Sequence, residues 1–322
     1  MNTADNSKQL KVQFKTATDD DAGQRLDNYL ARTLKGVPRS MIYRILRRGE
    51  VRVNKGRVSP SYKLQLGDEI RIPPVRVSAG PVTIPSSNLH LVQDLADRIL
   101  YENELFLVVD KPAGIAAHGG SGIEFGLIEA LRALRPEQSF LELAHRLDRE
   151  TSGCLIVAKR RSALRNLHEQ FRQRVVKKRY LTLVPGQWDR RQKLIEAPLK
   201  RNELRSGERM VEVNFREGAP SATSFEIVEN LQHATLLAAM PHTGRTHQIR
   251  VHCAYARHPV GGDTKYGDEE FNARLRALGL KRMFLHAFRI SFEDPDSGRI
   301  LKIEAPLPAE LQATVEKLRL KA

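Results

Sequence analysis

Cysteine is scarce in this chain, and no apolar run in it is long. The 322 residues include 2 cysteines, Cys154 and Cys253, each with apolar neighbours. Two cysteines exclude a disulfide scaffold and a cysteine-based zinc site, so both are predicted to be buried thiols in a reducing compartment. Apolar runs such as 105–109 and 234–240 fall far short of the roughly 20 residues that span a bilayer. Since residues 1–14 are polar and mixed in charge, we expect a cytoplasmic protein.

Acidic residues are outnumbered. The chain has 53 Lys or Arg against 38 Asp or Glu, a formal net charge of +15, which indicates a polyanionic partner such as nucleic acid or a membrane surface. The excess is local: residues 24–73 contain 12 basic and 4 acidic side chains, and residues 159–179 contain 9 basic side chains against Glu169 alone. Two such patches predict a binding footprint. The length suggests about two domains, and the 41 % hydrophobic content is that of a globular protein.

The first basic patch has the apolar periodicity of two helices, at 25–34 and 40–48. Short strands are predicted at 51–54 and 69–72, each bordered by a turn. Arginines lie away from the apolar side of the second helix and flank it, and their forked guanidinium groups suit phosphate. These candidate RNA-binding residues are Arg39, Arg44, Arg47, Arg48 and Arg52.

The run from Arg39 to Asn54, continued by Gly67-Asp68-Glu69-Ile70, resembles the S4 RNA-binding domain. The resemblance implies an N-terminal domain of two helices plus short strands at residues 21–75, which docks on structured RNA; it implies no chemistry. We expect residues 1–20 to be a flexible tail. Residues 76–97 are expected to be a linker, because proline and serine are dense there and periodicity is lacking.

Short strands and helices alternate from residue 98 to residue 322. This alternation predicts an α+β domain with a large mixed, mainly antiparallel sheet. Helices are predicted at 126–134 and 162–174. Strands are predicted at 105–109, 154–158, 179–184, 224–228, 234–238 and 300–303.

Polar stretches between these elements are where chemistry is expected, because loops held by a rigid sheet carry most functional residues. In 145–153, Asp148 lies between two arginines just before an apolar strand. A carboxylate near guanidinium groups stays ionised and oriented, as a nucleophile or base requires. Tyr180 follows a basic helix and could stack on a base. The plainer interpretations are a surface turn with an ordinary ion pair and a half-buried strand tyrosine.

Other motifs argue against cofactors. His247 and His252 are five residues apart, which does not match the four-residue spacing of a helical zinc motif, so no metal site is predicted. The glycine-rich stretches 118–122 and 258–267 have neither Walker nor dinucleotide-binding spacing. The residues alone therefore indicate an RNA-binding protein that could modify RNA. A non-catalytic ribosome-assembly protein and a metal-dependent RNA hydrolase remain as alternatives.

The motifs around Asp148, Tyr180, 244–252 and 285–287 occur in the order typical of another family. Over residues 98 to about 310 the chain resembles the pseudouridine synthases of the ribosomal large-subunit class. The resemblance implies a catalytic domain with a central cleft that isomerises uridines of 23S ribosomal RNA to pseudouridine. It further implies a monomer without metal or cofactor, which acts on free RNA or on an assembling large subunit.

Specific roles follow from the same resemblance. Asp148 matches the catalytic aspartate, Arg250 the arginine that pairs with it, and Tyr180 the tyrosine that packs on the target base. Arg146 matches a residue that replaces the extruded uridine in the RNA stack. Three further residues are expected to contact RNA: Lys177, Lys178 and His247.

Overall fold

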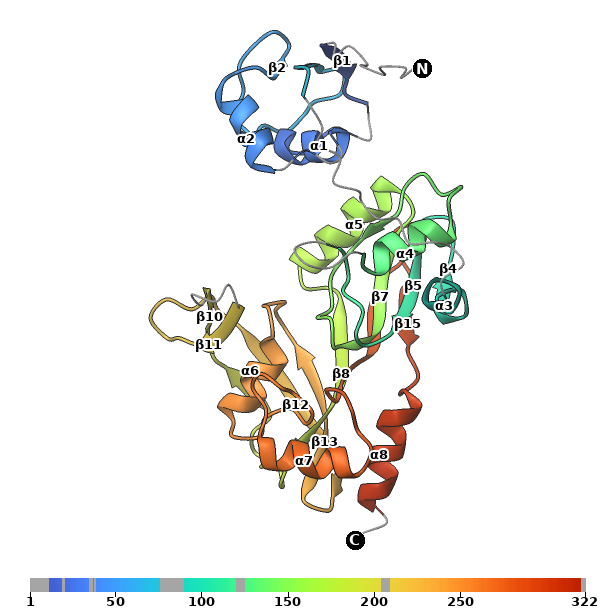
Figure 1. The fold of residues 1–322 in the computed structure, drawn as a ribbon, viewed down its shortest axis with the longest axis vertical. Helices are drawn as coiled ribbons and strands as arrows, with labels where there is room; N and C mark the ends of the chain where they lie inside the picture. The colour runs from blue at the N-terminus through green and yellow to red at the C-terminus, as the bar shows by residue number, and fades with distance from the viewer. Residues whose placement is uncertain are drawn as a thin grey trace, which may run out of the picture. The chain divides into compact units, whose positions relative to one another are not determined.

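The computed structural model describes residues 12–18, 21–34, 37, 39–75, 90–119, 125–203 and 209–319. The chain forms two compact units, Met1–Thr83 and Ile84–Ala322. Figure 1 shows the helices and strands of both units as a ribbon coloured along the chain.

The first unit packs two helices on a small antiparallel sheet. Its described elements are β1 (Gln13–Thr16), α1 (Leu26–Thr33), α2 (Arg39–Arg47), β2 (Arg52–Val53) and β3 (Glu69–Ile72). The sheet order is β1-β3-β2. Both predicted helices are present, and they bury their apolar faces in one core, to which α1 contributes Leu26 and Leu30 and α2 contributes Ile42 and Ile45.

The predicted basic surface of this unit is present in part. Arg44, Arg47 and Arg48 are exposed. Arg52 is half-buried, and its Nε donates to the carbonyl oxygen of Gly49 at 2.8 Å. The side chain of Arg39 lies outside the described residues.

The N-terminal segment differs from the predicted flexible tail of residues 1–20. Residues 13–16 form β1, which pairs with β3 in register from Gln13 opposite Ile72 to Thr16 opposite Glu69. All four β1 side chains are exposed, so main-chain hydrogen bonds rather than burial hold this strand. The rest of the predicted tail, residues 1–11 and 19–20, lies outside the described residues.

A single large sheet forms the frame of the second unit. Its order is β4-β5-β7-β14-β8-β13-β12-β9, with β15 on β14 and β6 on β7. The pairing of β14 with β7 is parallel, and the other described pairings are antiparallel, so the prediction of a mixed, mainly antiparallel sheet is confirmed. Its strands are β4 (Ile99–Glu102), β5 (Phe106–Lys111), β6 (Glu142–Leu143), β7 (Ser152–Ala158), β8 (Lys177–Pro185), β9 (Leu194–Glu196), β12 (Ala222–Leu231), β13 (Ala234–Pro241), β14 (Leu285–Glu293) and β15 (Ile300–Glu304).

Helices cover both faces of this sheet. Strand β5 shows why: Leu107 and Val109 pack in a core with α4, whereas Phe106 and Val108 pack in a core with α5. A separate hairpin, β10 (Leu199–Glu203) and β11 (Arg209–Val213), lies against α6. The helices of the unit are α3 (His90–Gln93), the 3₁₀ helix η1 (Ala96–Arg98), α4 (Leu127–Leu134), α5 (Arg161–Arg172), α6 (Gln248–Tyr255), α7 (Glu269–Ala277) and α8 (Ala309–Arg319).

Part of the predicted linker at 76–97 belongs to this unit instead. Residues 90–98 contain α3 and η1, and Val92 and Leu95 are fully buried in the core that α4 shares. The proline- and serine-rich part of the predicted linker, 76–89, lies outside the described residues. The prediction was wrong at 90–97 because the apolar face is too short to show helical periodicity.

Close backbone approach shapes the strand that follows Asp148. Gly153 has φ +109°, and a Cβ there would lie 2.3 Å from the carbonyl oxygen of Ala287. Glycine therefore permits β7 and β14 to run in parallel at the point where they meet. Cys154 and Cys253 are both buried, as predicted. Among the described residues no helix is long and apolar enough to cross a membrane.

Candidate active site

A cleft of about 600 Å³ opens in the second unit. Its walls are the loop 144–148, the end of α5 with the residues after it, the start of β8, and residues 241–250. The cleft brings together six residues that the sequence singled out: Arg146, Asp148, Lys178, Tyr180, His247 and Arg250. Lys177, also expected to contact RNA, is exposed on β8 and is not among the residues that line it.

The charge of the cleft is one-sided. Among the described residues that line it, Asp148 is the only acid. The cationic side chains of the lining are Arg146, Arg172, Arg174, Lys178, Arg245 and Arg250. Such a positively charged surface suits a polyanion, one group of which would lie next to the Asp148 carboxylate.

Asp148 occupies a tight turn between buried anchors. Leu147 before it and Thr151 after it are buried, and the Thr151 N–H donates to the Asp148 carbonyl oxygen at 3.1 Å. The Arg149 peptide that follows Asp148 is hydrogen-bonded to Lys111, which is fully buried at the end of β5. Its Nζ donates to the carbonyl oxygen of Arg149 at 3.1 Å and to that of Ile115 at 2.8 Å. The turn is therefore rigid while the Asp148 side chain stays 22 % exposed.

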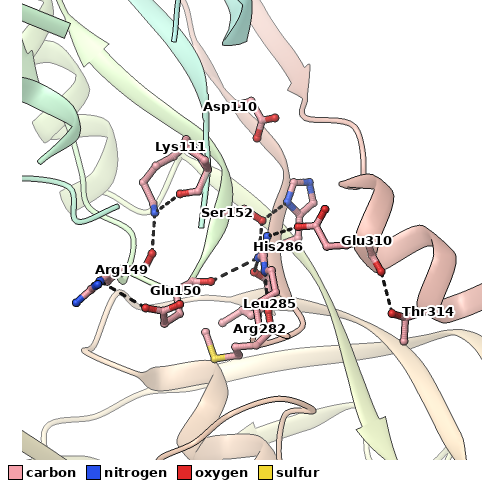
Figure 2. A network of polar contacts seen from close by, with 12 residues as sticks. Asp110, Lys111, Arg149, Glu150, Ser152, Arg282, Leu285, His286, Glu310 and Thr314 are labelled. Carbon is pink, nitrogen blue, oxygen red and sulfur yellow. Dashed lines mark hydrogen bonds and ion pairs between the residues drawn. The ribbon is translucent and has the colours of Figure 1, made fainter. Parts of the chain in front are cut away.

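A second polar network holds the far end of this turn (Figure 2). Arg282 Nη2 donates to Ser152 Oγ at 2.8 Å, and Ser152 Oγ lies 2.8 Å from His286 Nδ1. Burial lowers the pKa of His286 to about 4, so the ring is neutral and can accept from the serine hydroxyl. Arg282 also forms an ion pair with Glu310 of α8 at 3.2 Å. These contacts tie β7, β14 and α8 together directly behind the Asp148 turn.

Arg250 connects Asp148 to a second, hidden aspartate. Its Nη1 lies 3.7 Å from Asp148 Oδ2. Its Nε and Nη2 donate to Asp263 at 2.6 and 2.8 Å. Asp263 also accepts N–H groups of Lys265 and Tyr266, and its side chain is fully buried. Although burial opposes it, the Arg250 guanidinium lowers the pKa of Asp263, so the pair is ionic.

Asp263 was missed by the sequence analysis, which treated 258–267 as a glycine-rich turn without a role. The glycines before it carry the signal that could have found it. Gly262 has φ +74°, and a Cβ there would lie 2.2 Å from the carbonyl oxygen of Arg282. The turn thus passes through the interior, where a carboxylate needs a partner.

His247 and Tyr266 lie beside this pair. His247 Nε2 is 4.0 Å from Asp148 Oδ2, and His247 Nδ1 is 2.8 Å from Tyr266 Oη. The Tyr266 ring lies 5.0 Å below the Arg250 guanidinium. Tyr266 was not among the predicted site residues.

The dense polar stretch 244–252 proves to be a turn followed by a buried helix, α6. Gln248 anchors its start: Nε2 donates to Thr223 Oγ1 and Oε1 accepts from Thr243 Oγ1. His252 is fully buried, and its ring nitrogens lie 2.9 Å from Thr223 Oγ1 and 3.0 Å from Ser221 Oγ. His247 and His252 thus have different partners. The hydrogen bonds of Gln248 and His252 fix the orientation of α6.

Burial tunes the remaining polar groups of the cleft. It raises the pKa of Tyr180, an effect to which the Asp148 charge adds, so the phenol stays protonated. It lowers the pKa of Lys178 to about 8, and the Nζ of that lysine donates to the Thr243 carbonyl oxygen at 3.3 Å. Burial also lowers the pKa of His145 to about 3, and its Nε2 accepts the Ile156 N–H at 3.1 Å. The cleft that contains Asp148 is therefore lined by a protonated tyrosine and by a lysine whose pKa is about 8.

Comparison with known proteins agrees with this geometry. A family model described as RNA pseudouridylate synthase matches residues 105–255, and the S4 domain model matches residues 24–70. The solved structure of Human RNA Pseudouridylate Synthase Domain Containing 4 shares the fold, with a TM-score of 0.59 and 23 % identity over 71 % of this chain and 95 % of that chain. The fold and its cleft define a pseudouridine synthase domain preceded by an S4 domain.

Two curated relatives make the assignment more specific. "Ribosomal large subunit pseudouridine synthase C" of Pasteurella multocida is 58 % identical over 308 residues, 96 % of this chain and 94 % of the relative. The protein of the same name from Escherichia coli K12 is 56 % identical over 310 residues, 96 % of this chain and 97 % of the relative. The chain belongs to the family of ribosomal large-subunit pseudouridine synthases, and it is an enzyme.

Proposed function

We propose that this enzyme isomerises specific uridines of 23S ribosomal RNA to pseudouridine, with Asp148 as the catalytic carboxylate. The observation that carries the proposal is the position of Asp148, which is the only acid among the described cleft residues and lies 3.7 Å from Arg250. The names of the relatives support a large-subunit RNA substrate. In this proposal the enzyme is a cytoplasmic monomer, and its substrate is either free 23S RNA or an assembling large subunit.

The reaction balances without any added reagent. The N1–C1′ bond breaks, the uracil turns over, C5 bonds to C1′, and the proton lost from C5 is replaced by one gained at N1. No net oxidation, hydrolysis or phosphoryl transfer takes place, so the chemistry calls for no metal or nucleotide cofactor. Asp148 has three routes open to it: attack on C6 of the uracil, attack on C1′, or removal of the C2′ proton.

The uridine must leave its helix before the base can rotate. Base flipping costs roughly a few kcal/mol of lost stacking. In the proposal, Arg146 takes the vacated place in the stack, Tyr180 packs on the extruded base, and Lys178 holds phosphate. The S4 unit adds sequence-independent affinity through its exposed arginines, and Lys177 and His247 complete the expected contacts.

The test is Asp148→Asn, which keeps the shape of the side chain and removes its charge. We expect no release of tritium from 23S RNA that carries [5-³H]uridine, while the affinity for that RNA stays within a few fold. Asp189→Asn is the matched control, because Asp189 is on the surface and pairs with Arg191 alone among the described residues. Continued turnover by Asp148→Asn would refute the role of the carboxylate. Cleaved RNA or loss of activity in EDTA would instead indicate a metal-dependent hydrolase.

A further inference from the structure

A chain of polar contacts leads from the β10–β11 hairpin to the candidate catalytic carboxylate. The Val211 N–H of β11 donates to Tyr266 Oη at 3.0 Å. Tyr266 Oη lies 2.8 Å from His247 Nδ1, and His247 Nε2 lies 4.0 Å from Asp148 Oδ2. Tyr266 and Asp148 are thus next to different ring nitrogens of His247.

The protons along this chain follow from the donors and acceptors. A backbone N–H can only donate, so Tyr266 Oη accepts from Val211 and has its own hydrogen left to give. His247 Nδ1, 2.8 Å away, is within reach of that hydrogen, and as its acceptor Nδ1 is unprotonated. A neutral imidazole with a bare Nδ1 has its hydrogen on Nε2, the nitrogen that faces Asp148. Burial lowers the pKa of His247, which keeps the ring neutral.

Two donors converge on one oxygen of Asp148. Arg250 Nη1 at 3.7 Å and His247 Nε2 at 4.0 Å both face Oδ2. These distances are longer than hydrogen bonds, as is common at catalytic groups before the substrate closes the site. Both side chains therefore contact the same carboxylate oxygen, His247 from the N-cap of α6 and Arg250 from its first turn.

We propose that His247 is a positioning residue which, with its tautomer set by Tyr266, holds Oδ2 of Asp148 together with Arg250 and so orients the carboxylate toward the uridine. The inference rests on the proposed role of Asp148 and gives His247 a task other than RNA contact. The backbone of His247 is left-handed, with φ +53°, a conformation in which glycine, asparagine and histidine are more frequent than other residues.

Two substitutions separate the two ring nitrogens. The amide nitrogen of His247→Gln occupies the place of Nε2 and can still donate to Asp148. The amide nitrogen of His247→Asn occupies the place of Nδ1 and cannot reach it, although asparagine suits the left-handed backbone better. We expect kcat to fall about ten-fold for the Gln variant and at least about a hundred-fold for the Asn variant, with RNA affinity within a few fold of the unmodified enzyme. An Asn variant as active as the Gln variant would overturn the proposal.

A spectroscopic readout does not depend on turnover. In the full-length enzyme labelled with ¹⁵N-histidine, we expect His247 to show a bare Nδ1 and a protonated Nε2, and Tyr266→Phe to convert this signal to a mixture of tautomers. Phe keeps the ring under Arg250, so only the hydroxyl is lost. A protonated Nδ1 in the unmodified enzyme would refute the inference. Turnover by Asp148→Asn would refute the proposed function instead, and the tautomer result would still stand.

Discussion

Asp263 accepts hydrogen bonds from Arg250 at both carboxylate oxygens, at 2.6 and 2.8 Å, and the third guanidinium nitrogen of Arg250, Nη1, lies 3.7 Å from Asp148. The side chain of Asp263 is fully buried, whereas that of Asp148 is 22 % exposed. One arginine therefore has a structural carboxylate behind it and a candidate catalytic carboxylate in front. The bidentate pair with Asp263 fixes the plane of the Arg250 guanidinium group. The fold therefore sets the orientation of this guanidinium group relative to Asp148.

Asp263→Asn should damage both stability and activity. Removing one partner of a buried ion pair leaves the other unpaired, at a cost of about 3–5 kcal/mol in the free energy of unfolding. We expect a lower melting temperature and a loss of about a hundred-fold in kcat, because Arg250 is no longer held in place. Calorimetry and the tritium-release assay measure the two effects.

Glu229→Gln is the matched control for that variant. Glu229 pairs with Arg319 through two hydrogen bonds as Asp263 pairs with Arg250, but at the surface. Its loss should change the free energy of unfolding by less than about 1 kcal/mol. If Asp263→Asn is as mild as Glu229→Gln, Arg250 does not depend on Asp263.

Lys178 should make RNA binding sensitive to alkaline pH. Burial lowers its pKa to about 8, so its positive charge is present below that pH and is lost as the pH rises through it. The affinity for RNA is expected to decline between about pH 7.5 and 9.5 by up to ten-fold per pH unit for this one proton. Binding of 23S fragments by the Asp148→Asn enzyme measures the effect without turnover.

Lys178→Arg should remove this dependence, because arginine stays charged throughout the range. Lys177→Arg is the control, since Lys177 is an exposed neighbour on the same strand and should leave the profile unchanged. A profile that is identical for all three proteins would show that Lys178 is not the titrating group.

The exposed arginines of the S4 unit should determine much of the salt dependence of RNA binding. The variant replaces with glutamine the three exposed arginines Arg44, Arg47 and Arg48. Each lost phosphate contact should reduce the slope of log affinity against log salt concentration by about 0.7 to 0.9. Turnover at saturating RNA should change little, because the catalytic cleft belongs to the other unit.

A second triple variant serves as the comparison for that experiment. It replaces three exposed arginines of the catalytic unit outside the cleft lining: Arg257, Arg274 and Arg276. We expect this protein to keep the original slope. Equal slopes for the two triple variants would mean that the S4 arginines do not contact phosphate.

Local patterns predicted part of the secondary structure. The apolar faces of α1 and α2 follow the helical period, and both helices occur where that period places them. The strands β5 and β7 were visible as apolar runs because both faces of the sheet are covered, so every residue in them is buried. The helix α6 was not visible in the sequence, because several of its buried residues are polar and it has no apolar stripe. Its buried Gln248 and His252 form hydrogen bonds with Thr223 of β12 instead.

By itself, the sequence determined the class of fold, the basic patches and, through ordered motifs, the candidates Asp148, Tyr180 and Arg250. These are properties of short segments, in which charge, period and motif are read within a few residues. Only the tertiary structure decided that Asp263 holds Arg250, that Tyr266 faces His247, and that the turn after Asp148 is tied to Lys111 and Arg282. Those contacts join residues 13 to 132 positions apart in the chain, beyond the reach of a local pattern. The contact of Arg282 with the turn forms where β7 and β14 meet in parallel and Gly153 leaves room for the Ala287 carbonyl oxygen.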